Sequence, residues 1–179
     1  MFSIFILYLQ SQNTVKMKKY LLFLLGLFAT ALPAMAQQTE EITQEKARLP
    51  HPYNVEEDGD AKITELLKKA KKEHKKLLVQ IGGNWCVWCL RFNNLVTTDP
   101  QLKTILDKKY IYYHLNYSPE NKNPKAFAKY GNPGEKFGYP AFLIIDSKGT
   151  VLYTQKSEEL EEGRGYSTAK VKKFLQGRL

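Results

Sequence analysis

Both cysteines of the chain lie in one short stretch, NWCVWC, which spans residues 84–89. Cys86 and Cys89 are separated by two residues, and a tryptophan stands directly before each of them. Two cysteines at this spacing can form a structural disulfide, supply part of a metal site, or exchange electrons with other thiols. Each possibility makes a different demand on the rest of the sequence.

A structural disulfide gains little at this spacing, and a metal site lacks ligands. In the chain-entropy model, a bridge that closes four residues stabilises a fold by only about 2 kcal/mol, against about 4–5 kcal/mol for a loop of domain length. A closed zinc site needs four ligands, of which a CxxC pair provides two. The histidines of the chain, His51, His74 and His114, form no paired pattern. We therefore expect no metal.

Thiol–disulfide exchange fits the local sequence best. The apolar run LLVQIG before the motif is typical of a buried strand, whereas Cys89, Phe92 and Val96 share one face of a helix. Cys86 therefore falls where a strand ends and a helix begins, and the free N–H groups at a helix N-terminus favour a thiolate. We expect Cys86 to be the nucleophile and Cys89 to resolve the mixed disulfide. This exchange needs no cofactor.

The rest of the sequence predicts the elements that position this motif. Strands are expected at 77–82, 110–116, 141–146 and 150–155, and a turn at 147–149 joins the last two in a hairpin. Helices are expected at 60–74 with Asp60 as N-cap, from the motif onward, after Asp99-Pro100, and after Ser167. Residues 117–138 are loop-like, with a turn or two of helix near 126–130. One βαβ crossover and one hairpin predict an α/β fold with a central mixed sheet flanked by helices on both faces.

On these features the sequence resembles the thioredoxin superfamily, over about residues 60–179. The resemblance is carried by WCVWC after the strand LLVQIG, by Gly138-Tyr139-Pro140 before the strand AFLIID, and by the hairpin and the final helix. The chain looks most like small exported bacterial thioredoxin-like proteins with a WCxWC centre. The resemblance implies a thioredoxin-like fold with Pro140 cis beside the cysteines. It also implies that Tyr139 offers its backbone to substrate and that Trp85 shields the site and contacts substrate.

Two positions depart from thioredoxins proper. Those proteins keep a buried Asp six residues before the first cysteine, where this chain has Gln80. A glutamine cannot take the proton that the second thiol loses, so water or another group must do so. Between the cysteines, Val87-Trp88 replaces the family's Gly-Pro. That pair tunes the reduction potential in the family, so the resemblance does not fix the direction of electron flow.

Two further side chains are candidates for tuning the site. His114 falls where the family often has a lysine near the buried Asp. It is either a proton shuttle, since the unperturbed pKa of histidine lies near neutrality, or a strand residue without a chemical role. Trp88 either packs against the loop 117–138 as a shelf for substrate or simply packs its own helix.

The N-terminal residues have the layout of a secretory signal peptide. Residues 1–36 contain no Asp or Glu, and a basic start at 17–19 is followed by an apolar run at 20–32 and the small-x-small pattern at 34–36. That run is shorter than the roughly 20 residues of a membrane span, although an uncleaved anchor is the alternative. Residues 1–16 carry no charge until Lys16. We therefore expect Met17 to be the initiator, 1–16 an upstream start artefact and 17–36 the signal peptide.

The mature chain, 37–179, is large enough for one domain with its own core. We expect 37–57 to be a polar lead-in or tether and 58–179 to be the thioredoxin-like domain. The net charge of +9 becomes +6 without Lys16, Lys18 and Lys19. The remaining basic residues are spread over helices and loops, so we expect no nucleic-acid partner and no stable membrane insertion after signal cleavage. Export places the protein in an oxidising compartment, periplasmic or secreted.

The sequence thus predicts an exported thiol–disulfide oxidoreductase that acts on protein or peptide disulfides. The resemblance favours a reductase. A disulfide oxidase or isomerase in folding is one alternative, and a thioredoxin-fold binding or chaperone module with incidental cysteines is another. A single CxxC pair also implies a separate redox partner that recharges it.

Overall fold

The computed structural model describes residues 37–177, so the expected signal peptide and upstream stretch lie outside the described residues. The chain divides into one unit that ends at Glu45 and a second that begins at Lys46. Residues 37–48 are helical, where an irregular tether was one expectation; they are rich in good helix formers and contain no glycine or proline. Between residues 37 and 177, no helix is long and apolar enough to span a membrane. The site described below belongs to the second unit.

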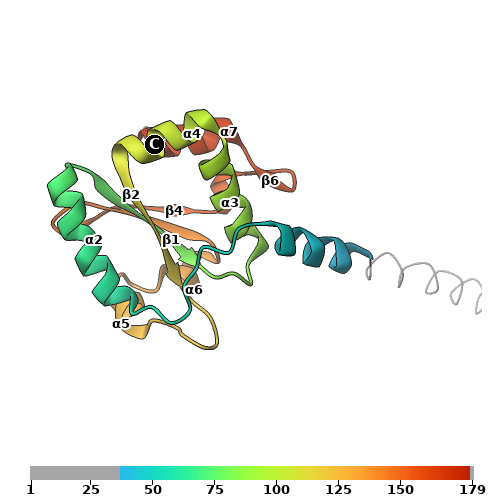
Figure 1. Ribbon diagram of the computed structural model, residues 1–179, viewed down its shortest axis with the longest axis horizontal. Helices are drawn as coiled ribbons and strands as arrows, with labels where there is room; N and C mark the ends of the chain where they lie inside the picture. Colours follow the sequence, from blue (N-terminus) through green and yellow to red (C-terminus); the bar gives the residue numbers. More distant parts are fainter. Residues whose placement is uncertain (1–36, 178–179) are drawn as a thin grey trace, which may run out of the picture. The chain divides into compact units, whose positions relative to one another are not determined.

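A four-stranded mixed sheet forms the centre of the second unit (Figure 1). Its strands are β1 (Lys76–Gly82), β2 (Tyr110–Asn116), β3 (Ala141–Ile145) and β4 (Val151–Lys156), and their order across the sheet is β2-β1-β3-β4. β1 pairs parallel with β2 and antiparallel with β3, which in turn pairs antiparallel with β4. The expected crossover and hairpin are therefore both present.

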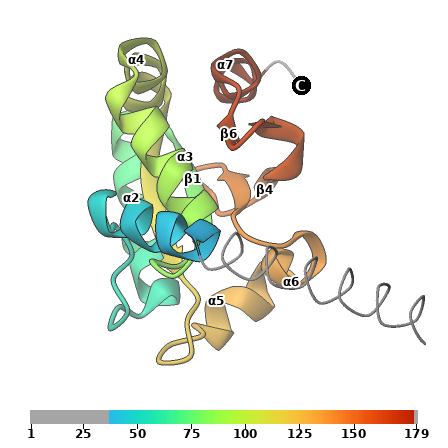
Figure 2. The ribbon, with the colours of Figure 1, turned by 90° about the vertical axis from the view of Figure 1, so that its right-hand side faces the viewer.

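Helices cover both faces of this sheet. One face carries α3 (Val87–Thr98), α4 (Pro100–Lys109) and α7 (Thr168–Gln176), and the other carries α2 (Gly59–Glu73) and α5 (Pro124–Lys129). Figures 1 and 2 show α4 and α7 next to each other at one end of the sheet. The short α6 (Pro133–Phe137) lies just before β3 in the chain. The mixed sheet with helices on both faces is the architecture that the sequence predicted.

The central strand β1 explains why both faces need a cover. Its residues alternate between two buried clusters, with Leu78 on the face of α3, α4 and α7, and Leu77 on the face of α2 and α5. Gln80 has the same parity as Leu78, so its side chain points to the face that α3 covers. Gln80 also lies opposite His114 of β2 in the register. This polar position under α3 forms the base of the site.

Three details differ from the sequence prediction. The N-cap of α2 is Asp58, whose carboxylate accepts from the N–H groups of Asp60 (3.0 Å) and Ala61 (3.1 Å), so Asp60 lies inside the first turn. The loop at 117–138 contains α5, which confirms the helical turn expected near 126–130, and a second short helix, α6, which was not expected. A small hairpin, β5 (Glu161–Glu162) and β6 (Gly165–Tyr166), follows the 3-10 turn η1 (Glu158–Leu160) and was not expected.

Candidate functional site

The two cysteines form a disulfide at the N-terminus of α3, with their Cα atoms 5.2 Å apart. Cys86 is the N-cap residue, in an extended conformation, and its Sγ accepts from the N–H of Cys89 at 3.2 Å. Cys89 is fully buried, whereas Cys86 keeps 6% of its surface exposed. Of the two sulfurs, a substrate can therefore reach only that of Cys86 directly.

The residues expected to meet a substrate surround Cys86. The Tyr139–Pro140 peptide bond is cis, as the resemblance implied, and the carbonyl oxygen of Tyr139 lies 3.7 Å from Cys86 Sγ. Trp85 is 47% exposed, and its ring meets that of Tyr139 edge to face at 5.5 Å. The Trp85 indole N–H donates to the carbonyl of Tyr117 at 2.7 Å, which fixes the ring at the rim of the site.

Val87 and Trp88 are the two residues between the cysteines. Val87 is the first residue of α3 and is half-buried. Trp88 meets the ring of Tyr166 edge to face at 5.5 Å, and the Arg91 guanidinium lies 5.0 Å from its ring centre. Trp88 therefore packs on β6 rather than on the loop 117–138, and the expectation of a substrate shelf against that loop is wrong. Tyr166 belongs to the unexpected hairpin, which is why the sequence did not show this contact.

Gln80 lies beneath the disulfide and is completely buried. Its Nε2 donates to the hydroxyl of Tyr53 at 2.7 Å and to the carbonyl of Cys89 at 2.8 Å, and its Oε1 accepts from the hydroxyl of Tyr112. Every polar atom of this amide thus has a partner. The position that holds a carboxylate in thioredoxins proper is here the centre of a neutral hydrogen-bond network.

Tyr53 is a site residue that the sequence did not predict, because it lies in the segment that was interpreted as a polar lead-in or tether. Its side chain is 4% exposed and packs against Cys86 and Cys89. Asn84 fixes its backbone: the Asn84 amide accepts from the N–H of Tyr53 at 3.1 Å and donates to its carbonyl at 2.9 Å. The only available signal was that Tyr53 is the single aromatic residue within 37–57.

Burial keeps the titratable side chains beneath the cysteines, His114, Tyr53 and Tyr112, neutral. Burial lowers the pKa of His114 to about 4, so the expectation of a proton shuttle with a near-neutral pKa is not met. Its ring lies 4.4 Å from that of Tyr112 and 5.1 Å from that of Tyr53, and among residues 37–177 nothing hydrogen-bonds its Nε2. Burial also raises the pKa of Tyr53 and of Tyr112 well above the usual value for tyrosine. None of these side chains is charged near pH 7.

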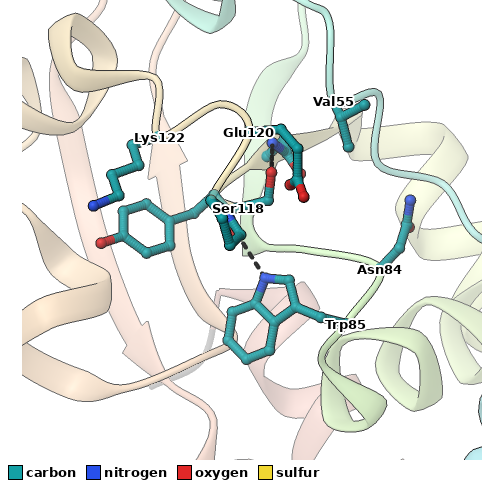
Figure 3. A pocket seen from close by; sticks show the side chains of 9 residues that line it. Val55, Asn84, Trp85, Ser118, Glu120 and Lys122 are labelled. Atoms are coloured by element: carbon teal, nitrogen blue, oxygen red, sulfur yellow. Dashed lines mark hydrogen bonds between the residues drawn. The ribbon is translucent and has the colours of Figure 1, made fainter.

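A pocket of about 680 Å³ opens beside Trp85 (Figure 3). Its walls come from the segment before α2, from the loop before Trp85 and from the loop that follows β2. The lining residues are Val55, Asn84, Trp85, Asn116, Tyr117, Ser118, Pro119, Glu120 and Lys122. Because Trp85 directly precedes Cys86 in the chain, a substrate bound at the nucleophile has this pocket next to it.

Comparisons with known proteins agree with this geometry. Residues 60–147 match a family model described as Thioredoxin-like. Among solved structures, the chain is similar to the disulphide isomerase from Xylella fastidiosa Temecula1, with 26% identity and a TM-score of 0.63 over 72% of this chain and 97% of that one. It is also similar to a structure described as DsbH oxidoreductase, with 21% identity and a TM-score of 0.46 over 63% and 78%. A search of curated proteins finds no match. The family match begins after Tyr53.

Proposed function

Since this chain belongs to the thioredoxin superfamily and is a thiol–disulfide oxidoreductase with a CxxC centre, we propose that it reduces disulfides of exported proteins or peptides. In this proposal Cys86 is the nucleophile and Cys89 the resolving thiol. The observation that carries the assignment is the unequal burial of the pair: Cys86 borders the exposed Trp85 and the Tyr139 carbonyl, whereas Cys89 lies on the buried face of α3.

The reaction moves one electron pair in two exchanges. The Cys86 thiolate attacks one sulfur of the substrate disulfide, forming a mixed disulfide and releasing the other substrate sulfur as a thiolate. The Cys89 thiolate then attacks Cys86 Sγ, the bond from Cys86 to the substrate breaks, and the second substrate thiolate leaves. The protein ends with the Cys86–Cys89 disulfide, and the substrate ends with two thiols. A separate redox partner must return the pair to the dithiol.

Three features support a site that binds polypeptide. The Tyr139 backbone stands beside Cys86 Sγ at the start of β3, where an extended substrate can lie along it. Trp85 offers an exposed aromatic face at the same place. The pocket next to Trp85 provides room for a side chain of the substrate. Tyr139, Pro140 and Trp85 are accordingly assigned to substrate binding.

The surroundings of Cys86 support the reducing direction. Its Sγ receives one N–H donor, from Cys89, and faces a carbonyl oxygen, which gives a thiolate no stabilisation. The apolar side chains that pack against the cysteine pair are Tyr53, Trp88 and Tyr139. Strong oxidants of this superfamily owe their potential to a stabilised reduced form, so a Cys86 sulfur with a single N–H donor favours a lower potential than theirs.

One observation favours a second function. The chain is similar to a protein described as a disulphide isomerase, over nearly the whole length of that protein. An isomerase uses the same first attack but lets the substrate thiol, rather than Cys89, resolve the mixed disulfide. The two functions differ in how fast Cys89 completes the reaction, which the trapping experiment below measures.

Export is part of the proposal and rests on the sequence of residues 17–36. Cells that express the full chain should yield a protein beginning at Gln37 outside the cytoplasm. A second gene that starts at Met17 should give the same product in the same amount. A product that keeps residues 17–36, or stays in the cytoplasm, would contradict this part.

Trapping of mixed disulfides tests the central assignment. The Cys89→Ser variant should accumulate covalent adducts with extract proteins through Cys86, and reductant should release them. The Cys86→Ser variant should trap poorly, because its remaining sulfur is buried. The double variant controls for non-covalent retention. Equal capture by all three would indicate a binding module with incidental cysteines, and stable adducts with wild-type protein would indicate an isomerase.

A further inference from the structure

The hydrogen bonds of Gln80 leave one proton of the buried network unassigned. The amide of Gln80 donates one hydrogen to Tyr53 and the other to the Cys89 carbonyl, while its oxygen accepts from Tyr112. The Tyr53 oxygen is therefore an acceptor toward Gln80, and its own O–H remains to donate. No hydrogen bond among residues 37–177 takes that proton; His114 Nε2, in the neighbouring ring, receives none.

The buried sulfur is next to this hydroxyl. Tyr53 packs with both cysteines in one cluster. A Cβ added at Gly82 in β1 would overlap Cys89 Sγ and would lie 3.1 Å from Tyr53 Oη. The hydroxyl and the sulfur are therefore both close to this one backbone position. In the disulfide this sulfur is a weak acceptor. After reduction it becomes a thiol, still a weak acceptor, and on losing its proton a thiolate, which accepts a strong, charge-assisted hydrogen bond.

We propose that the hydroxyl of Tyr53 donates a hydrogen bond to the sulfur of Cys89 in the reduced protein and thereby stabilises the thiolate that resolves the mixed disulfide. Tyr53 is then a catalytic residue, supplied by the segment before the family match. Its hydroxyl accepts from Gln80, the residue that stands where thioredoxins proper have a carboxylate. The inference rests on the proposed function and names a further residue of the same site.

The step balances without any additional reactant. Cys89 loses its proton to solvent, and the hydrogen bond from Tyr53 holds the resulting thiolate. The thiolate attacks Cys86 Sγ, the Cys86–Cys89 bond forms, and the bond between Cys86 and the substrate breaks. The substrate sulfur leaves with the electron pair and takes up a proton from solvent. Tyr53 keeps its own proton throughout.

Two features hold Tyr53 for this role. Asn84, two residues before Cys86, bonds both to the N–H and to the carbonyl of Tyr53, so the cysteine motif itself anchors the segment. Gln80 fixes the oxygen at 2.7 Å. Burial raises the pKa of the Tyr53 hydroxyl, which keeps it a donor at every working pH.

The titratable groups that face Tyr53 and Cys89 are Tyr112 and His114 of β2, Tyr166 of β6 and Tyr139 before β3. Burial raises the pKa of all three tyrosines, and it lowers that of His114 to about 4. None of them changes charge between about pH 5 and 9, so a change in rate over that range reports the thiols.

The test is single-turnover oxidation of the reduced mature protein by dithiobis(nitrobenzoate), which releases one coloured thiolate when Cys86 attacks and a second when Cys89 resolves. Tyr53→Phe should leave the rate of the first release unchanged. It should move the midpoint of the pH–rate profile of the second release about one pH unit higher. The thiolate fraction falls about tenfold and its nucleophilicity rises about threefold, so the second release slows about threefold at pH 7. At alkaline pH, where both proteins are ionised, the variant should be equal or faster.

Tyr110→Phe is the matched control, because it removes a buried hydroxyl that donates to the Leu175 carbonyl at the far end of β2. Its second release should follow the wild-type profile. A Tyr53→Phe profile that coincides with wild type would overturn the inference, as would uniform slowing at all pH values. If Tyr53→Phe does not fold, Asn84→Ala, which loosens Tyr53, decides by the same criterion. Loss of the first release in wild type would instead refute the proposed function.

Discussion

Gly82 is the position at which a single methyl group should change both stability and redox behaviour. It is the last residue of β1, and its backbone lies next to Cys89 of the disulfide. A Cβ at this position would overlap Cys89 Sγ, lie 3.5 Å from Cys89 Cβ and approach Tyr53 Oη to 3.1 Å. The backbone conformation of Gly82 is open to any residue, since its φ is not positive. The cost of Gly82→Ala is therefore steric.

The magnitude follows from the state of the sulfur. Overpacking a buried site typically costs about 1–3 kcal/mol. In the oxidised protein Cys89 Sγ is tied to Cys86 and cannot move away, whereas in the dithiol the side chain is free to rotate. If the whole cost falls on the oxidised state, the reduction potential rises by about 20–60 mV, since 30 mV corresponds to about 1.4 kcal/mol. The melting temperature of the oxidised form should fall by about 2–4 °C per kcal/mol.

The assay is equilibration of Gly82→Ala in thiol–disulfide buffers with alkylation trapping, together with thermal melts of the oxidised and reduced forms. Gly165→Ala is the matched control, because an added Cβ there meets nothing within 4 Å. We expect the control to match wild type in both measurements. A Gly82→Ala variant that keeps the wild-type potential and melting temperature would refute a steric clash with the disulfide, as would one that destabilises the reduced form more than the oxidised form.

Two further predictions concern stability. Asp99→Ala should lower the free energy of unfolding by about 0.5–2 kcal/mol, because Asp99 caps α4 by accepting from Gln101 (2.9 Å) and Leu102 (3.0 Å). Ser167→Ala should change it little in the same denaturant titration, since Ser167 makes no side-chain capping bond; equal costs would contradict the assignment of these caps. His114 is neutral in the folded protein down to about pH 4, whereas an unfolded histidine binds a proton near pH 6.5. The burial of neutral His114 therefore contributes fully to the free energy of unfolding above about pH 6.5. This contribution, about 3 kcal/mol in total, is lost as the pH falls toward 4. His114→Phe should remove this slope from denaturant titrations between pH 7 and 4, and an unchanged slope would contradict the burial of the ring.

The parts of the site that the sequence predicted are those fixed by local chemistry. A strand that ends in glycines followed by a helical apolar pattern places Cys86 at a helix N-terminus, and the structure confirms it. Asp99-Pro100 starts α4 as expected, because an acidic cap and a proline at the first helical position need no tertiary contact. The cis peptide before Pro140 came from the resemblance, not from local pattern.

The parts that the sequence did not predict depend on contacts between distant segments. Tyr53 reaches the cysteines only because its backbone pairs with Asn84, 31 residues later, and no local pattern encodes that pairing. Trp88 finds its partner in a hairpin whose strands are two residues long, too short for a period to show. The lowered pKa of His114 arises from burial under α3, which the strand sequence alone does not show.

The reduction potential of the mature chain, 37–179, is the measurement that tests the account most directly. Oxidised and reduced protein would be equilibrated in thiol–disulfide buffers and separated by alkylation trapping. The single N–H donor to Cys86 Sγ and the proposed reducing function predict a value close to that of thioredoxin, about −270 mV. A value near −120 mV would mean that the reduced form is strongly stabilised and that the protein oxidises its substrates, contrary to the function proposed here.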